Sequence, residues 1–418
     1  MPIGNNFQHA VYSRSDPGER VGYRDLLIGA PPDSLAWQDA MAGMGAQLAH
    51  AGVRLVVFLH GTARRTDVFG MQRLDDVGGL KRGYSRGIAG LDALLALMRE
   101  STNGVSTLND GPTPPFMDDD PTKQLIDNEA GDAANFSHSY VEAFGKAINR
   151  STERPIRCER VLWSSEHHHI GRSQAALQIV SRLHALGLEQ KLGPGDRILV
   201  QAHGHAGLVM ALASNLLAPH ESAGRAIFLQ TIKDYSTHTG ASTTGIDLLE
   251  QAPAQALNGA ALDIATFGTP VRYGWDPSSL GKLLHIVNHR PMRVDGKRWL
   301  AKMELPQITM EMPIAWGGDY VQQLAVAGTD ALPASPDAKT VNKVLWELLE
   351  PYEGFERWLE CVRKSVRCQN DGRCLLIDYK DSTSTSSAKD HLYGHAAYTR
   401  LNAMLFNTTE VVTSLFAS

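Results

Sequence analysis

Short continuous apolar runs recur along the chain, separated by stretches in which apolar residues follow helical spacing. The runs are rich in valine, isoleucine, leucine and phenylalanine, which is typical of strands buried on both faces of a sheet. We predict strands at residues 54–59, 160–165, 198–200, 261–270, 283–287 and 374–378. We predict helices at residues 34–51, from about 172 to 188, and from about 206 to 217. This alternation indicates βαβ units, and so an α/β fold with a mainly parallel central sheet flanked by helices.

Two segments interrupt the alternation. Residues 101–135 are rich in serine, asparagine, glycine and proline and contain the acidic run Asp118-Asp119-Asp120, which is typical of a long surface insertion. The acidic run has the character of a solvated loop, and a cation site is the alternative. We expect one domain over residues 1–418, with a lid or cap at 101–150 and a second cap segment at 218–258.

The charge balance narrows the class of partner. Of the 418 residues, 43% are hydrophobic and 20% are charged, and the formal net charge is −5. This balance gives no electrostatic basis for nucleic acid or an anionic membrane as the main partner. The N-terminus lacks a basic region followed by an apolar run, and no stretch of about 18 apolar residues occurs. We therefore expect no transmembrane segment, and a protein that is cytoplasmic or exported without a cleavable signal peptide.

The cysteines indicate neither a zinc site nor a disulfide scaffold. The four of them, Cys158, Cys361, Cys368 and Cys374, lack Cys-x-x-Cys spacing and are few for this length. Cys368 and Cys374 flank the turn Gln-Asn-Asp-Gly-Arg and could pair across it. We expect free thiols, because a reducing cytosol keeps cysteines reduced.

The most informative segment follows the third predicted strand, where the chain passes through Ala202-His203-Gly204-His205-Ala206 into a helix. A nucleophile elbow has this layout. Its central residue takes a strained, positive-φ conformation, and the residues two positions away are small because strand and helix nearly touch there. Ala202 and Ala206 are small, and Gly204 enters the positive-φ region without strain. Gly204 thus keeps the turn and removes the nucleophile, unless the segment is an ordinary glycine-containing loop.

Four segments, in this order along the chain, resemble the α/β-hydrolases, specifically their lipase- and esterase-like bacterial members. Leu-Val-Val-Phe-Leu-His-Gly-Thr at 55–62 looks like the strand before an oxyanion loop. Ala-His-Gly-His-Ala-Gly-Leu-Val at 202–209 is similar to the lipase elbow Gly-His-Ser-x-Gly-Gly-Leu-Val. Thr-Phe-Gly-Thr-Pro at 266–270 looks like the lipase strand that ends in Gly-Thr-Pro-His, and Tyr-Gly-His-Ala-Ala-Tyr-Thr at 393–399 looks like the loop of the catalytic histidine. The resemblance covers roughly residues 50–415 and implies the α/β-hydrolase fold.

The resemblance implies a role for each matching residue. Gly204 stands where the family has its nucleophilic serine. The backbone N–H groups of Thr62 and His205 would form the oxyanion hole, which stabilises the charge developing on an acyl oxygen. His395 would be the general base, with His391 as the nearby competitor. The residues expected to line the pocket are His60, His169, Arg172 and His203.

The acid of the triad has several candidates. The family places it after the strand that follows Gly-Thr-Pro. Asp319, in the turn Trp-Gly-Gly-Asp-Tyr-Val, is our choice, and a turn-capping aspartate is the alternative interpretation. Asp295 and Asp378 are the other candidates. Arg172 would orient an acidic group of the substrate or be an ordinary solvated arginine.

No other serine is expected to replace the nucleophile. Ser164 and Ser165 end a neighbouring predicted strand, and Ser214 lies more than two turns along the helix after the elbow. A water held by His395 is a further candidate, yet loss of a triad nucleophile costs on the order of a million-fold in rate. We therefore expect an inactive or strongly impaired chain, which is either a natural pseudoenzyme or an enzyme with a Ser→Gly substitution at Gly204.

A histidine-rich metal site is the rival interpretation. Among the 16 histidines, His167-His168-His169 follows one predicted strand and His203-x-His205 follows another. Paired histidines near further His and Asp residues hold zinc in several metallohydrolases. However, no His-Glu-x-x-His occurs, and a metal site leaves the small residues around the turn unexplained. The hydrolase interpretation requires neither a metal nor a cofactor.

The sequence thus predicts a scaffold for carboxylic-ester hydrolysis that acts on a small acyl ester or a lipid. A lipase- or phospholipase-type antibacterial effector is one alternative, because lipase-like proteins with long insertions act at membranes. A metallohydrolase is another, and the last is a non-catalytic module that binds an ester-like ligand or a protein partner. The fold alone does not fix the substrate.

Overall fold

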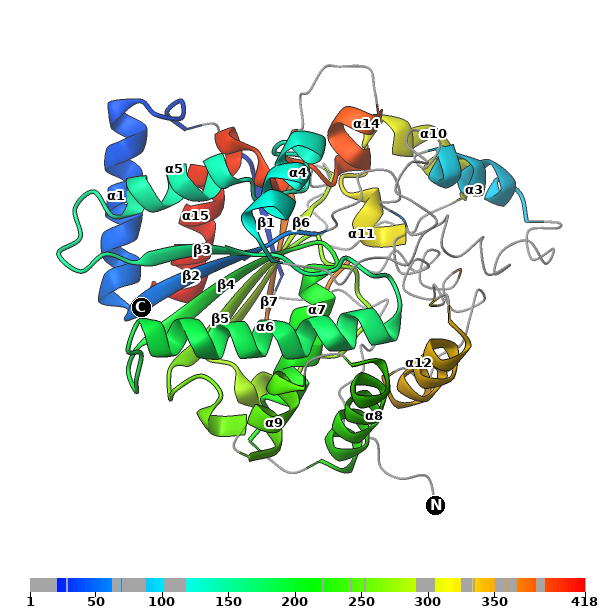
Figure 1. The fold of residues 1–418 in the computed structure, drawn as a ribbon. Helices are drawn as coiled ribbons and strands as arrows, with labels where there is room; N and C mark the ends of the chain where they lie inside the picture. The colour runs from blue at the N-terminus through cyan, green and yellow to red at the C-terminus, as the bar shows by residue number, and fades with distance from the viewer. Residues whose placement is uncertain are drawn as a thin grey trace.

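A seven-stranded sheet forms the centre of the molecule (Figure 1). The computed structural model describes residues 21–27, 29–61, 69, 88–100, 118–219, 222–240, 243–251, 253–290, 305–324, 333, 335–349, 359, 367–380 and 388–417. The sheet order is β1-β7-β6-β5-β4-β2-β3, and each of these neighbouring pairs is parallel. The structure therefore confirms the prediction of an α/β fold with a parallel sheet flanked by helices.

Each predicted strand overlaps a strand of this sheet. The strands are β1 (Val21–Asp25), β2 (Val53–Leu59), β3 (Arg157–Val161), β4 (Arg197–His203), β5 (Ala261–Phe267), β6 (Lys282–Asn288) and β7 (Arg373–Asp378). Buried apolar runs predicted the inner strands well, because both of their faces are covered.

The two edge strands depart from the prediction. β3 begins before the apolar run at 160–165, since Arg157 and Glu159 are half-buried at the edge of the sheet and give no apolar signal. The apolar residues that follow β3 belong to a loop in which Trp163 is fully buried. β1 was not predicted, because only Val21 of its five residues is buried.

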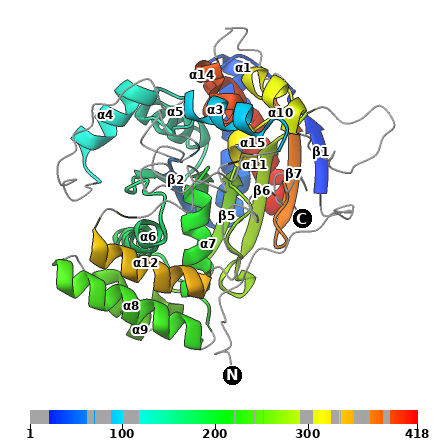
Figure 2. The ribbon, with the colours of Figure 1, turned by 90° about the vertical axis from the view of Figure 1, so that its right-hand side faces the viewer.

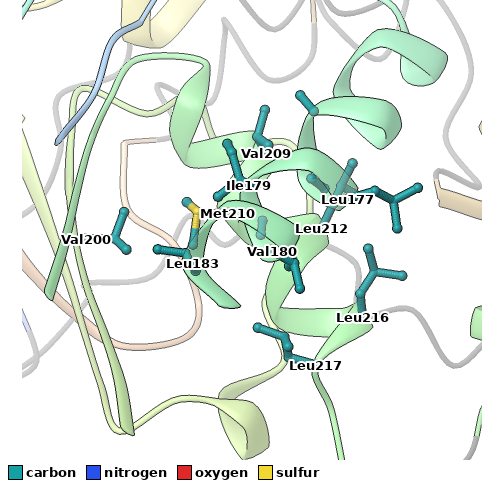
Figure 3. Packing of buried hydrophobic residues seen from close by; sticks show 14 of the residues in the cluster. Leu177, Ile179, Val180, Leu183, Val200, Val209, Met210, Leu212, Leu216 and Leu217 are labelled. Carbon is teal, nitrogen blue, oxygen red and sulfur yellow. The ribbon is translucent and has the colours of Figure 1, made fainter. Parts of the chain in front are cut away.

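Successive side chains of the strands meet helices on opposite faces of the sheet. One face carries α1 (Leu35–His50), α5 (His138–Ile148) and α15 (Leu401–Leu415). The other carries α6 (His169–Glu189) and α7 (Ala206–Leu216), whose apolar core is shown in part in Figure 3, with Leu183 and Met210 near Val200. The predicted helices match α1, α6 and α7 to within a few residues.

A further layer covers α6 on the side away from the sheet (Figures 1 and 2). It consists of α8 (Ala223–Thr239), α9 (Thr244–Gln251) and α12 (Pro336–Leu349). The second cap segment expected at 218–258 supplies α8 and α9 of this layer.

A separate apolar cluster joins the short helices α3 (Leu91–Glu100), α10 (Leu305–Glu311) and α11 (Tyr320–Leu324) to the 3-10 turn η6 (Leu392–Gly394). The helix α14 (Ala388–His391), which leads into η6, groups with these helices in both views. In the expected lid, residues 101–117 lie outside the described residues, and α5 packs against α1 and β3. The acidic run begins α4 (Asp120–Ala130), where the Asp119 side chain accepts a hydrogen bond from the Thr122 N–H. Among the described helices, none is both long and apolar enough to cross a membrane.

Candidate active site

The segment predicted as an elbow is a tight turn between a central strand and a helix. β4 ends at His203, Gly204 has a φ of +53°, and α7 starts at Ala206. The Gly204 N–H donates to the Phe267 carbonyl oxygen at 2.8 Å. The Thr269 hydroxyl donates to the Gly204 carbonyl oxygen at 2.9 Å. These two bonds fix the turn against the end of β5, and a glycine meets its backbone requirement without strain.

A buried carboxylate–imidazole pair faces this turn. His395 Nδ1 donates to Asp319 Oδ2 at 2.7 Å, and both side chains are almost fully buried. With Nδ1 directed at Asp319, the other ring nitrogen, Nε2, faces Gly204, and in the neutral ring it is the acceptor. A Cβ built on Gly204 would lie 2.7 Å from His395 Nε2 and 3.2 Å from Cε1. The three positions of the expected triad therefore come together, although they lie far apart in the sequence.

Asp319 is oriented by several donors. The Tyr398 hydroxyl donates to Oδ2 at 2.7 Å, and the Gln322 N–H donates to Oδ1 at 2.8 Å. Burial, together with the neighbouring Asp319 charge, raises the pKa of Tyr398 well above its usual value, so this hydroxyl stays a donor. The same hydroxyl accepts the Asn288 N–H at 2.7 Å. The carboxylate is thereby held in one orientation toward His395.

The loop that carries Asp319 is also held through its backbone. The Asp319 N–H donates to the Asn288 carbonyl oxygen at 2.9 Å, which connects the loop to the end of β6. Arg367 is fully buried and donates to the carbonyl oxygens of Asp319 and Gly317, each at 2.7 Å. Burial lowers the pKa of Arg367 to about 10, which leaves the guanidinium charged at neutral pH. This buried cation lies beside the loop of the buried carboxylate.

The other acid candidates have different places. The Asp378 carboxylate accepts the Lys380 N–H at the end of β7, and Asp295 lies outside the described residues. His395 is the histidine that contacts Asp319, whereas His391 is buried at the start of a short turn before it.

The expected oxyanion hole is described on one side only. Thr62 lies outside the described residues, while Gly61 precedes it, and the Gly61 Cα lies 3.5 Å from the Cβ position of Gly204. His205 follows Gly204 at the N-terminal end of α7. Backbone N–H groups at a helix N-terminus favour a developing negative charge. The turn thus has a suitable donor position directly after residue 204.

One of the expected pocket histidines, His203, lies beside the pair, and His60 lies near His203. The ring centroids of His203 and His395 are 4.2 Å apart, and His203 Nε2 donates to the His395 carbonyl oxygen at 3.0 Å. Burial, aided by the charge of His395, lowers the pKa of His203 well below its usual value. Burial and, secondarily, Arg160 lower the pKa of His60 to about 3. Both rings are therefore neutral near pH 7, and His203 supports the backbone of His395.

The remaining two expected pocket residues lie at the start of α6. His169 Nδ1 lies 2.7 Å from the Tyr273 hydroxyl, and its pKa is lowered well below the usual value by burial and then by Arg172. Arg172 is fully buried and donates to the His167 carbonyl oxygen at 2.6 Å. Arg172 is therefore buried, whereas the sequence left open that it was an ordinary solvated arginine.

Two of the three alternative serines, Ser165 and Ser214, are engaged elsewhere. Ser165 has a φ of +55°, and its hydroxyl lies 3.1 Å from His60 Nε2. The Ser214 hydroxyl donates to the Ala211 carbonyl oxygen within α7. Gly204 is the position that His395 Nε2 faces.

The two histidine clusters predicted from the sequence contact each other through His167 and His205, but their arrangement is not that of a metal site. The rings of His167 and His205 have centroids 4.4 Å apart. Within the described ranges, no group of three or more His, Cys, Asp or Glu side chains is arranged to hold a metal ion.

Tyr398 and Arg367 were missed by sequence reasoning. Tyr398 lies three residues after His395, in the same 393–399 segment that resembles the loop of the catalytic histidine. Its closeness to His395 in the sequence could therefore have indicated a role at the site. Arg367 follows no recognisable motif.

Comparison of the chain with protein-family models, curated proteins and solved structures finds no match.

Proposed function

We propose that this chain is a carboxylic-ester hydrolase scaffold of the α/β-hydrolase type in which Gly204 occupies the nucleophile position. The observation that carries the proposal is the buried Asp319–His395 pair whose Nε2 faces Gly204 at a positive-φ turn between strand and helix. The chain order of Gly204, Asp319 and His395 supports it, because α/β-hydrolases carry nucleophile, acid and histidine in that order.

A serine at position 204 would suit ester hydrolysis once the His395 ring moves back, because Nε2 now lies 2.7 Å from the Cβ position. A serine Oγ would give its proton to His395 Nε2 while it forms a bond to the acyl carbon. The N–H of His205 would stabilise the charge on the acyl oxygen. His395 would then protonate the departing alcohol, and water would release the acyl group in a second round. Asp319 would hold the imidazole in the required tautomer throughout.

Gly204 offers no such hydroxyl, so the chain as written forms no acyl-enzyme. We therefore infer that its own activity is to bind an acyl ester or a lipid with strongly impaired hydrolysis. His203 beside the pair and His60 near His203 are both neutral, which suits an uncharged ester group better than an anion.

The variant Gly204→Ser tests the proposal. The variant should hydrolyse p-nitrophenyl esters of short or long acyl chains and should react with a fluorophosphonate probe at residue 204. The matched controls are Gly204→Ala, which adds a Cβ without a hydroxyl, and Gly204→Ser with His395→Ala, which removes the base. A folded Gly204→Ser protein that neither turns over any of these esters nor takes the probe would overturn the assignment.

A further inference from the structure

Two cysteine thiols lie in contact near the amino end of β7. Cys374 Sγ lies 3.3 Å from Cys368 Sγ, within hydrogen-bonding distance for sulfur, and both carry thiols in this structure. Cys374 is buried against Val21 and Val287, whereas Cys368 is half-buried at the border of the same apolar cluster. Cys374 is therefore buried, whereas Cys368 retains partial exposure.

The segment that carries Cys368 also holds the loop of Asp319. Its neighbour in the chain, Arg367, donates to the Asp319 and Gly317 carbonyl oxygens. On the other side, the Gln369 side chain donates to the Pro270 carbonyl oxygen at 3.2 Å. The chain then turns at Gly372, whose φ is +74°, and enters β7. A bond between the two sulfurs would close this turn and tie Arg367 to the sheet.

We propose that Cys368 and Cys374 form a thiol–disulfide modification site that reacts with low-molecular-weight disulfides of the glutathione type. The resulting intramolecular disulfide fastens Arg367, and with it the Asp319 loop, to β7. The inference does not depend on the proposed function, since it concerns the covalent state of the chain.

The chemistry balances with one small disulfide. The half-buried Cys368 thiolate attacks a sulfur of the small disulfide, forms a mixed disulfide and expels one small thiolate. Cys374 then attacks Cys368 Sγ, so that the second small thiolate leaves and the intramolecular disulfide forms. The two cysteines are oxidised, the small disulfide is reduced to two thiols, and the two cysteine protons pass to those thiols.

Cys158 serves as an internal control: like Cys368 it is half-buried, but it lies on β3 and its thiol donates to the Ile156 carbonyl oxygen at 3.8 Å. Burial, followed by the charge of Glu159, raises the pKa of the Cys158 thiol to about 12. The thiolate is the reactive form, so exchange at Cys158 should be slow.

The site is tested by incubating the reduced, folded protein with graded ratios of reduced and oxidised glutathione. Remaining thiols are then trapped with N-ethylmaleimide and mapped by mass spectrometry. We expect a chain lighter by two hydrogen atoms, loss of label from Cys368 and Cys374 together, and full labelling of Cys158 after denaturation. The variant Cys374→Ser should instead retain one glutathionyl group on Cys368, because the second exchange cannot follow.

Hydrogen–deuterium exchange of the oxidised and reduced forms tests the connection to the Asp319 loop. Oxidation should slow exchange at residues 317–322 and raise the unfolding midpoint by roughly 2–6 °C. Cys158→Ser should respond to oxidation in the same way as the parent chain. The proposal is overturned if both cysteines remain labelled at a high proportion of oxidised glutathione, if Cys361 takes the place of either one, or if oxidation leaves exchange at 317–322 unchanged.

Discussion

The imidazole of His395 approaches Gly204 more closely than any side chain at that position would allow. Its Nε2 atom lies 2.7 Å from the point where a Cβ would stand, and real Cβ atoms essentially never show such a contact. The hydrogen bond from Nδ1 to Asp319 is nevertheless intact at 2.7 Å. The imidazole of His395 thus packs directly against the backbone of Gly204. A side chain at position 204 would require the ring to move away.

Substitution of Gly204 should therefore cost stability in a way that depends on the new side chain. Gly204→Ala should lower the free energy of unfolding by about 1–2 kcal/mol, because alanine is strained at a φ of +53° and its Cβ displaces the ring. Gly204→Ser has the same backbone strain as Gly204→Ala. Its Oγ can donate a hydrogen bond to His395 Nε2, which contributes about 1 kcal/mol to the free energy of unfolding. Urea unfolding should rank the glycine chain first, serine second and alanine last. Equal stability of the alanine variant and the parent would contradict the close approach.

Tyr398 should influence hydrolysis through Asp319, whereas its neighbour Tyr379 should influence stability alone. Tyr398→Phe removes a donor from Asp319 Oδ2 and leaves the Asn288 N–H without its acceptor, at a cost of about 1–3 kcal/mol. Tyr379→Phe is the matched control, because its hydroxyl is also buried but donates to Asn407 at 2.6 Å. Both changes should destabilise the chain.

Steady-state kinetics in the Gly204→Ser background separate the two tyrosines. Tyr398→Phe should lower kcat with little change in KM, since the carboxylate that orients His395 loses a support. Tyr379→Phe should leave both constants unchanged. If the two variants show the same kinetics, Tyr398 has only a structural role.

The sequence predicted the parts of the site that rest on local backbone chemistry. Gly204 and its small flanks describe a turn whose shape is set within five residues, and His395 and Asp319 follow from a resemblance in chain order. Hydrophobic runs predicted the inner strands because both faces of those strands are covered. In each case the signal lies within a short window of the chain.

The contacts that the sequence could not give join distant segments. Arg367 meets Asp319 only because the chain returns to the end of β6 before it enters β7, and no spacing rule encodes that return. Arg172 was expected as a pocket residue or a solvated side chain, but α6 carries it into the interior, where the His167 carbonyl oxygen is its acceptor. Burial of a single arginine depends on the packing of whole elements.

Gly268 should tolerate no side chain, because it lies beneath the pair. Its φ is +64°, and a Cβ there would collide with the Asp319 carboxylate and stand 2.8 Å from the Tyr398 ring. Gly268→Ala should therefore destabilise the chain by about 2–4 kcal/mol, from backbone strain and overpacking together. Gly43→Ala is the control, since this glycine of α1 has nothing within 4 Å of its Cβ position. That change should raise stability by up to about 1 kcal/mol, and equal effects of the two substitutions in urea unfolding would exclude steric conflict at Gly268.

Buried neutral histidines should make the fold sensitive to mild acid. Burial lowers the pKa of His60 to about 3 and that of His289 to about 3, whereas in the unfolded chain a histidine takes up its proton near pH 6.5. Between these values the unfolded state binds more protons than the folded state, so stability falls as the pH falls. Each histidine should account for a loss of about 1.4 kcal/mol between about pH 7.5 and about pH 5.5.

Urea unfolding of His60→Gln at the two pH values measures this dependence. Glutamine does not titrate, so the variant should lose about 1.4 kcal/mol less than the parent over that interval, whatever its stability at the higher pH. His238→Gln is the control, because the His238 side chain is 73% exposed. It should follow the parent at both pH values. A His60→Gln protein with the full pH dependence of the parent would mean that His60 takes up a proton in the folded state.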